Sequence, residues 1–156
     1  MLVDSFDGQR ENEEIVEVWR PHPFTLSKTA LIIVLIIVIG SIPMASWHPS
    51  WSVDALLVFI AIAGLYGALN LYLWLNTIYI LTNERVFTIS QNSLFSRKNS
   101  ELALINIQTV SHTKRGLWQM ILNFGNVEIQ TAGASVSMVL KNVENPYRAQ
   151  QKILAK

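Results

Sequence analysis

The chain has 156 residues, of which 51% are hydrophobic and only 15% are charged, a balance that suits one small domain with a membrane anchor and leaves no room for a third unit. It contains no cysteine, which excludes disulfides, thiolate metal sites and cysteine nucleophiles. The net charge of +1 is unevenly distributed: residues 1–28 carry three Lys/Arg and six Asp/Glu, whereas residues 76–156 carry nine and four and are basic.

The N-terminal part changes from a polar tail to a short apolar segment. Residues 1–12 are polar and show no hydrophobic period, so we expect a flexible tail. Residues 13–20 contain β-branched and aromatic side chains and favour a strand, although Glu13, Glu14 and Glu17 would also suit one helical turn and are expected to form a solvated face. Two prolines then prevent a continuous helix, so residues 13–23 are predicted to form a strand and an elbow.

Two long apolar runs follow and predict a transmembrane hairpin over residues 24–75. The expected spans are residues 24–46 and 54–75, each long enough for the roughly 20 helical residues that cross a bilayer. Residues 46–52 between them allow only a tight turn. Pro43 is expected to kink or end the first helix, and Asp54 to lie at the start of the second as an N-cap or a first-turn acid.

The distribution of Lys and Arg predicts the orientation of this hairpin. Arg20 and Lys28 precede the first span and Arg85 follows the second, whereas the connecting loop has neither residue type. We therefore expect a multi-pass protein of the cell membrane with both termini in the cytoplasm. The acidic start and the length of the apolar run argue against a cleavable signal peptide.

Small residues four positions apart in the second span predict close helix packing. Ala63 pairs with Gly67 and Gly64 with Ala68 on shared helix faces. They could pack against the first span near its small residues, Gly40 and Ser41, or could support homo-oligomerisation.

After residue 76 the hydrophobic period changes from helical to alternating, which predicts an antiparallel β-domain over residues 76–156. We expect six strands, at residues 77–81, 85–90, 96–104, 106–112, 126–133 and 134–143, with a turn around Asn92. The side chains of Ile105 and Ile107 are expected to face inward. Those of Lys98, Glu101 and Gln108 are expected to face outward. The last two strands are expected to turn at residues 132–135. Residues 113–126 are predicted to hold a helical turn or apolar loop that folds onto the domain or the bilayer.

The last residues predict a C-terminal helix. Asn145 is a suitable N-cap with Pro146 at the first helical position. Ala149, Ile153 and Leu154 are expected on its buried face.

Three sequence motifs resemble the membrane-flanked bacterial pleckstrin-homology-like (PH-like) domain family: T-N-E-R at residues 82–85, I-x-x-V at 107–110 and F-G-N-V-E-I-Q-T-A-G at 124–133. The resemblance covers roughly residues 11–155. It implies an α+β membrane protein in which a bent antiparallel β-sandwich or partial barrel of seven strands is closed by a C-terminal helix. Residues 14–19 would then supply the seventh strand.

The sequence shows no motif for catalysis, a cofactor or a metal. No nucleophile elbow or phosphate loop is present, and His22, His48 and His112 lie on different segments. We therefore expect no enzyme activity.

Basic residues of the β-domain are the candidates for binding. The basic candidates are Arg85, Arg97, Lys98, Lys114 and Arg115, and the neighbouring apolar pair is Leu117 and Trp118. These side chains could contact lipid headgroups or a protein partner, or the basic ones could be solvated surface charges. In PH domains of the eukaryotic type a basic cluster lies near the first strand turn, but here that turn carries one acid beside one base, which argues against a phosphoinositide site. Nucleic-acid binding is not supported.

These features favour a membrane-anchored binding or assembly module without catalytic activity, with the bilayer and a protein partner or a second copy as its partners. The alternative is an accessory subunit of a membrane transport or export system.

Overall fold

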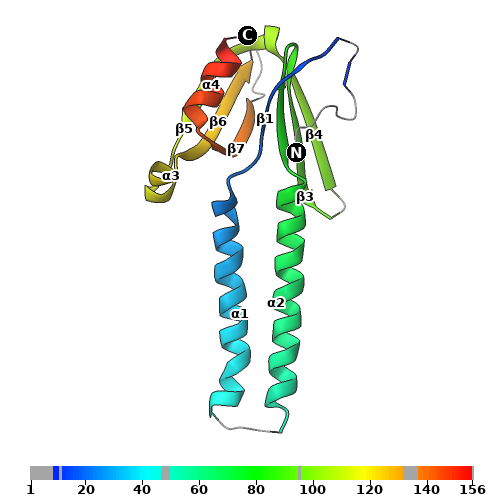
Figure 1. The fold of residues 1–156 in the computed structure, drawn as a ribbon, viewed down its shortest axis with the longest axis vertical. Coiled ribbons are helices and arrows are strands. Elements are labelled where there is room, and N and C mark those ends of the chain that lie inside the picture. Colours follow the sequence, from blue (N-terminus) through cyan, green and yellow to red (C-terminus); the bar gives the residue numbers. More distant parts are fainter. Residues whose placement is uncertain (1–8, 11, 47–49, 95, 132–136, 156) are drawn as a thin grey trace. The chain divides into compact units, whose positions relative to one another are not determined.

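The computed structural model describes residues 9–10, 12–46, 50–94, 96–131 and 137–155. The chain forms two compact units (Figure 1). One unit, the helical hairpin, is Pro23–Leu75. The other, the β-domain, combines Met1–His22 with Asn76–Lys156, so the hairpin interrupts the β-domain in sequence.

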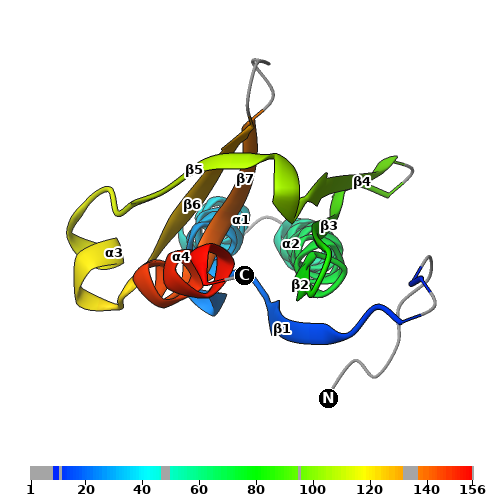
Figure 2. The ribbon, with the colours of Figure 1, turned by 90° about the horizontal axis from the view of Figure 1, so that it is seen from above.

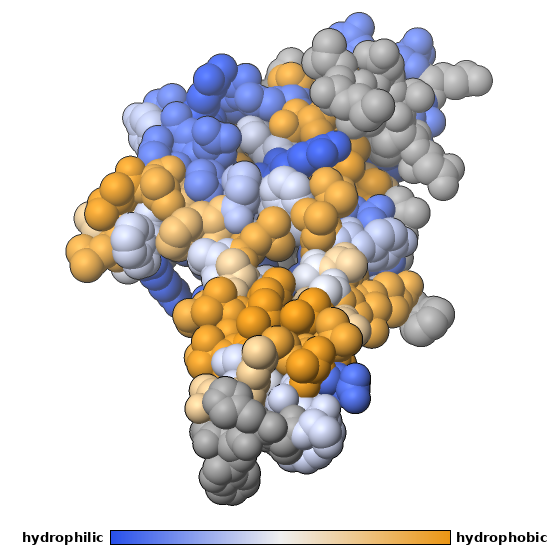
Figure 3. All heavy atoms as spheres, turned by 60° about the horizontal axis from the view of Figure 1, so that its bottom comes forward, coloured by the Kyte–Doolittle hydropathy of each residue, from blue (hydrophilic) through white to orange (hydrophobic). Residues whose placement is uncertain are grey.

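The helical hairpin consists of a short 3₁₀ turn η1 (Pro23–Leu26) and the helices α1 (Ser27–Ser46) and α2 (Ser52–Leu75). Both helices are long and apolar enough to cross a membrane, and little of either is buried. Apolar side chains cover the visible face of the hairpin (Figure 3). Asp54 lies in the first turn of α2, as expected. Pro43 lies inside α1, which continues to Ser46, so the helix does not end at this proline.

Within the hairpin, glycines face large side chains of the opposite helix. A Cβ at Gly40 would lie 2.6 Å from Cβ of Phe59, so that site has no room for a side chain, whereas one at Gly67 would lie 2.9 Å from Cδ1 of Ile33 and would require this methyl group to move. Ala63 is buried in the same interface. Gly67 thus packs against the first span, which was one of the two expected alternatives, although its neighbour is Ile33 and Gly40 contacts Phe59 instead.

The second small-residue pair of α2, Gly64 and Ala68, is exposed, and no atom lies within 4 Å of a Cβ built at Gly64.

The first sheet contains the N-terminal strand. Its order is β1-β2-β3-β4, all antiparallel, with β1 (Ile15–Trp19), β2 (Ile78–Thr82), β3 (Arg85–Ser93) and β4 (Ser96–Ala103). Ile15 pairs with Thr82 and Trp19 with Tyr79. The N-terminal segment is therefore a strand and not a helical turn, as the sequence favoured. Its partner β2 follows the hairpin in the sequence, whereas β1 precedes it. β3 runs through Asn92 and ends at Ser93, which pairs with Ser96, so the turn expected around Asn92 follows Ser93 instead.

The second sheet has the order β5-β6-β7, with β5 (Ile107–Thr113), β6 (Phe124–Thr131) and β7 (Ser137–Glu144). The 3₁₀ turn η2 (Leu104–Asn106) connects the two sheets, and the short helix α3 (Leu117–Ile121) connects β5 to β6. The turn expected at residues 132–135 lies outside the described residues. Figure 2 shows the two sheets and the C-terminal helix α4 (Pro146–Leu154), which packs next to β5 and β6.

Side chains from both sheets and α4 form one hydrophobic core. It includes Trp19 of β1, and its other buried members are Tyr79, Leu81, Val86, Val110, Val127, Ile129, Met138, Leu140, Val143, Ala149 and Ile153. The contribution of Trp19 shows that β1 is an integral strand of the β-domain.

Two core predictions are wrong for geometric reasons. Ile105 is 92% exposed because it lies in η2, which interrupts the strand alternation that placed it inward. Leu154 is exposed, whereas Ala149 and Ile153 are buried. The buried pair is spaced by four residues and shares a helix face, but Leu154 lies one position further around. The predicted N-cap is confirmed, since the Asn145 side chain accepts a hydrogen bond from N of Arg148.

Truncating the buried Leu81 should destabilise the β-domain strongly. We expect Leu81→Ala to cost about 2–5 kcal/mol, because it leaves a cavity between the sheets. The matched control Ile105→Ala should change stability by less than about 0.5 kcal/mol. Denaturant unfolding of the full chain in mild detergent, followed by near-UV circular dichroism, measures both. Equal losses would contradict the assigned core.

Candidate functional site

The T-N-E-R motif forms the turn between β2 and β3, and this turn binds the N-terminal segment. The backbone N–H of Glu14 donates to Oδ1 of Asn83 (3.0 Å), and N–H of Asn83 donates back to the carbonyl of Glu14 (3.1 Å). The Asn83 amide also donates to the carbonyl of Asn12 (3.2 Å). Asn83 of the motif therefore binds the backbone of residues 12 and 14, which precede the hairpin.

A buried ion pair reinforces this junction. Nε and Nη2 of Arg85 donate to the two carboxylate oxygens of Glu13 at 2.8 and 2.9 Å, which is a bidentate pair. The Thr82 hydroxyl donates to the same carboxylate (2.8 Å) and accepts from N–H of Arg85 (3.0 Å). Nη1 of Arg85 also pairs with Glu101 of β4, and the guanidinium lies over the Phe87 ring. The side chains of Glu13 and Arg85 are 0% and 7% exposed.

The ion pair shifts the pKa values of Glu13 and Arg85 in the directions that favour their charged forms. The hydrogen bond from Arg85 is the largest cause that lowers the pKa of Glu13 from its ordinary 4.5 to about 2, against the opposing effect of burial. The same hydrogen bond raises the pKa of Arg85 above its ordinary value. Both groups therefore stay ionised inside the protein at neutral pH.

This geometry corrects two sequence-based expectations. Arg85 was expected to face a lipid or a partner, but it is buried and engaged by two carboxylates. The glutamates were expected to form a solvated face, yet Glu13 is buried and Glu17 pairs with Lys152 of α4 at 2.6 Å, so only Glu14 is exposed.

The remaining basic candidates do not form one cluster. Lys98 is exposed on β4, and the backbone of Arg97 pairs with Gln91; the Arg97 side chain lies outside the described part of the structure. Lys114 and Arg115 lie between β5 and α3. β4 and α3 are on opposite sides of the β-domain (Figures 1 and 2). The structure thus separates Arg97 and Lys98 from Lys114 and Arg115.

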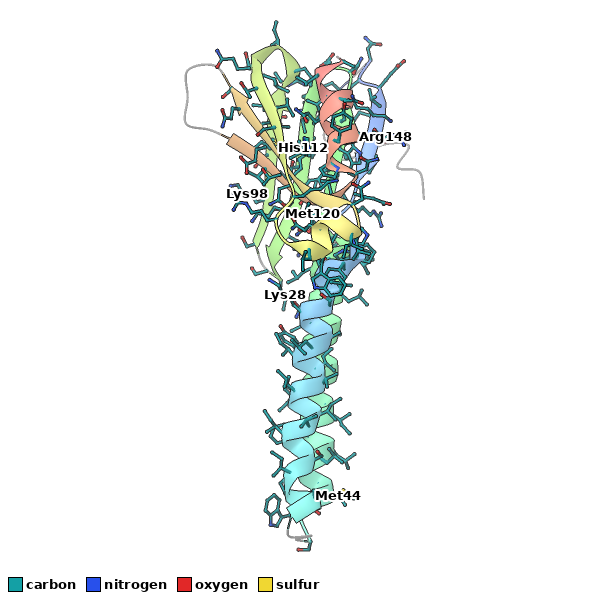
Figure 4. The ribbon with its side chains drawn as sticks, turned by 90° about the vertical axis from the view of Figure 1, so that its left-hand side faces the viewer. Lys28, Met44, Lys98, His112, Met120 and Arg148 are labelled. Carbon is teal, nitrogen blue, oxygen red and sulfur yellow. The ribbon has the colours of Figure 1, made fainter. Side chains whose placement is uncertain are left out.

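The connection between β5 and β6, here called the α3 loop (residues 114–123), exposes large apolar side chains. Gly116 precedes α3 with φ 90°, a conformation that favours glycine. Leu117 is 76% exposed and Ile121 70%, and Trp118 and Met120 are exposed as well. Met120 is marked on α3 in Figure 4. The loop is therefore not folded onto the core of the β-domain.

Contacts within the β-domain place the α3 loop near the point where the chain leaves for the hairpin. The ring of His22, the last residue before the hairpin, stacks on Phe124, the first residue after the loop, with 4.7 Å between centroids. N–H of His22 donates to the carbonyl of Asn142 (2.7 Å), and the Gln119 amide donates to Oδ1 of Asn142 (3.4 Å). The exit segment and the α3 loop thus share one end of the β-domain.

The described histidines have structural contacts. His22 stacks on Phe124, and His112 of β5 contacts Gln150 and the Tyr147 ring of α4. Among the residues that the structure describes, no three His, Cys, Asp or Glu side chains are grouped so as to hold a metal ion.

Comparison with known proteins identifies the family. The family described as Bacterial PH domain matches residues 24–156, and the chain belongs to this family. The PH-like resemblance of the sequence motifs is thus confirmed. A crystal structure of a DUF1696 family protein with a pleckstrin-homology domain, from Shewanella loihica PV-4, matches at 13% identity and a TM-score of 0.42, over 53% of this chain and 71% of that chain. A comparison with curated proteins gave no match.

Replacing Glu13 by Gln should destabilise the β-domain and remove an acid-sensitive contribution to its stability. Breaking one side of a buried ion pair costs about 3–5 kcal/mol. Because the pKa of Glu13 is lowered to about 2, its contribution is complete above about pH 4.5 and is lost as the pH falls toward 2. Unfolding in denaturant from pH 6 to pH 2.5 measures both effects, with a flatter pH profile expected for Glu13→Gln.

The neighbouring Glu14 provides the matched control, since its side chain is exposed and its junction contacts are made by its backbone. Glu14→Gln should leave both the stability and the pH profile close to those of the unmodified chain. Indistinguishable behaviour of the two variants would contradict the role assigned to the buried pair.

Proposed function

We propose that this bacterial PH protein is a membrane-anchored binding module without catalytic activity, whose hairpin crosses the cell membrane and whose β-domain faces the cytoplasm. The observation that carries the proposal is the insertion of two apolar helices between the paired strands β1 and β2. Such an insertion attaches the β-domain to the hairpin through both ends of the hairpin.

The exposed surface of the hairpin supports a membrane environment. In each span only 6% of the most apolar window is buried, whereas a core helix of a soluble protein would be mostly buried. Leu35 of α1 and Leu65 of α2 are 51% and 64% exposed. Each Leu, Ile or Val at bilayer depth favours insertion by about 0.3–0.6 kcal/mol, so the two helices together favour the membrane strongly.

The β-domain supports binding better than catalysis. The ion pair of Glu13 and Arg85 is buried, and its two charges are paired with each other at the N-terminal junction. The accessible features include exposed basic side chains and outer strands such as β4, whose backbone could pair with a strand from a protein partner. We therefore propose a protein partner or anionic headgroups as the ligand.

Reporter fusions test the proposed topology. A reporter that is active only in the cytoplasm should work when fused after Lys156 and should be inactive when inserted within residues 48–50, because Lys and Arg flank the hairpin outside that loop. A fusion that ends at Asn76 keeps the hairpin but lacks most of the β-domain, and it should behave like the fusion after Lys156. An active loop insertion together with inactive terminal fusions would contradict the proposal.

A further inference from the structure

We propose that the α3 loop inserts its apolar side chains into the headgroup region of an anionic bilayer. This inference rests on the proposed membrane anchoring and adds a second, peripheral contact between the β-domain and the lipid. The ligand is the bilayer surface itself.

The first argument is the number of apolar side chains on one short turn. Leu117, Trp118, Met120 and Ile121 are consecutive or nearly so, and each is more than 60% exposed. Single exposed apolar residues are common on protein surfaces, but a contiguous exposed group marks an interaction site. Ile105 provides the contrast, because it is a lone exposed side chain in a turn between the sheets.

The second argument is position. Phe124 directly follows the α3 loop and stacks on His22, which directly precedes the hairpin. The loop also bonds through Gln119 to Asn142, whose carbonyl accepts from N–H of His22. Within the β-domain, the apolar turn is therefore next to the residue from which the chain continues into the first apolar helix.

The third argument is chemical. Lys114 and Arg115 precede the apolar turn, and Arg115 is exposed. Basic residues beside Trp and aliphatic side chains are the composition of segments that lie in a membrane interface, where the cations attract anionic lipids and the apolar groups enter the acyl boundary. A protein partner would not require this combination, so we favour the bilayer.

Site-specific quenching tests the inference in the full chain, which contains no native cysteine. Met120→Cys is labelled with an environment-sensitive fluorophore, and the protein is reconstituted into phosphatidylcholine vesicles with and without phosphatidylglycerol. Lipids that carry a nitroxide near the headgroup should quench this probe several-fold more than a probe at Ile105→Cys. Ile105 lies just before β5 and the α3 loop begins just after it, and the length of β5 is about 20 Å. Ile105 is therefore a suitable control.

Two further variants identify the contributing side chains. Replacing Leu117 and Trp118 by Ser should abolish shallow quenching at Met120→Cys, and unchanged far-UV circular dichroism would verify folding, since both side chains are exposed. Replacing Lys114 and Arg115 by Gln should reduce quenching in the vesicles that contain phosphatidylglycerol more than in those that lack it.

A probe at Leu35→Cys in α1, read with deep nitroxide lipids, separates the inference from the proposed function. Quenching at Leu35 without quenching at Met120 would overturn the α3 inference and leave the membrane anchor intact. A blue-shifted but unquenched Met120 probe would likewise overturn it and would indicate a protein contact. If Leu35 itself is not quenched, the anchoring proposal and the inference both fail.

Discussion

The buried pair of Glu13 and Arg85 is the contact on which the arrangement of this chain depends. A charge inside a protein is costly unless a partner and further hydrogen bonds compensate for the lost water. Here Arg85 donates two hydrogen bonds to the Glu13 carboxylate, and the Thr82 hydroxyl and the backbone N–H of Arg10 donate one each. Among the described ion pairs, Glu13 has Arg85 as its partner, whereas Arg85 also pairs with Glu101. The Glu13 charge is therefore compensated only when residues on either side of the hairpin come together.

This constraint connects the fold to the proposed function. β1 continues the sheet from the T-N-E-R turn, and its pairing with β2 brings Trp19 opposite Tyr79. Only three residues separate β1 from the 3₁₀ turn of the hairpin, and only two separate α2 from β2. Both ends of the hairpin thus join the β-domain through short links. Under the proposed function, these short links would keep a binding surface of the β-domain at the membrane.

Local patterns predicted much of the fold, but not the central pair. Hydrophobic period and length identified both helices, the strands of the β-domain and the cap at Asn145, because these depend on neighbouring residues. Glu13 and Arg85 are 72 positions apart, so nothing in the sequence near either residue indicates burial, and both were expected on the surface. The family match begins at residue 24 and does not include β1. Ile105 was misplaced because a 3₁₀ turn breaks the strand alternation locally.

A double-mutant cycle between Glu13 and Arg85 tests the central claim most directly. Unfolding free energies would be measured for Glu13→Gln, Arg85→Gln and the double variant in the full chain in mild detergent. If the two side chains compensate each other's burial, the double variant loses little more stability than either single one, with a coupling energy of about 2–3 kcal/mol. Additive losses with no coupling would contradict the account, because they would show that the N-terminal segment and the T-N-E-R turn are stabilised independently.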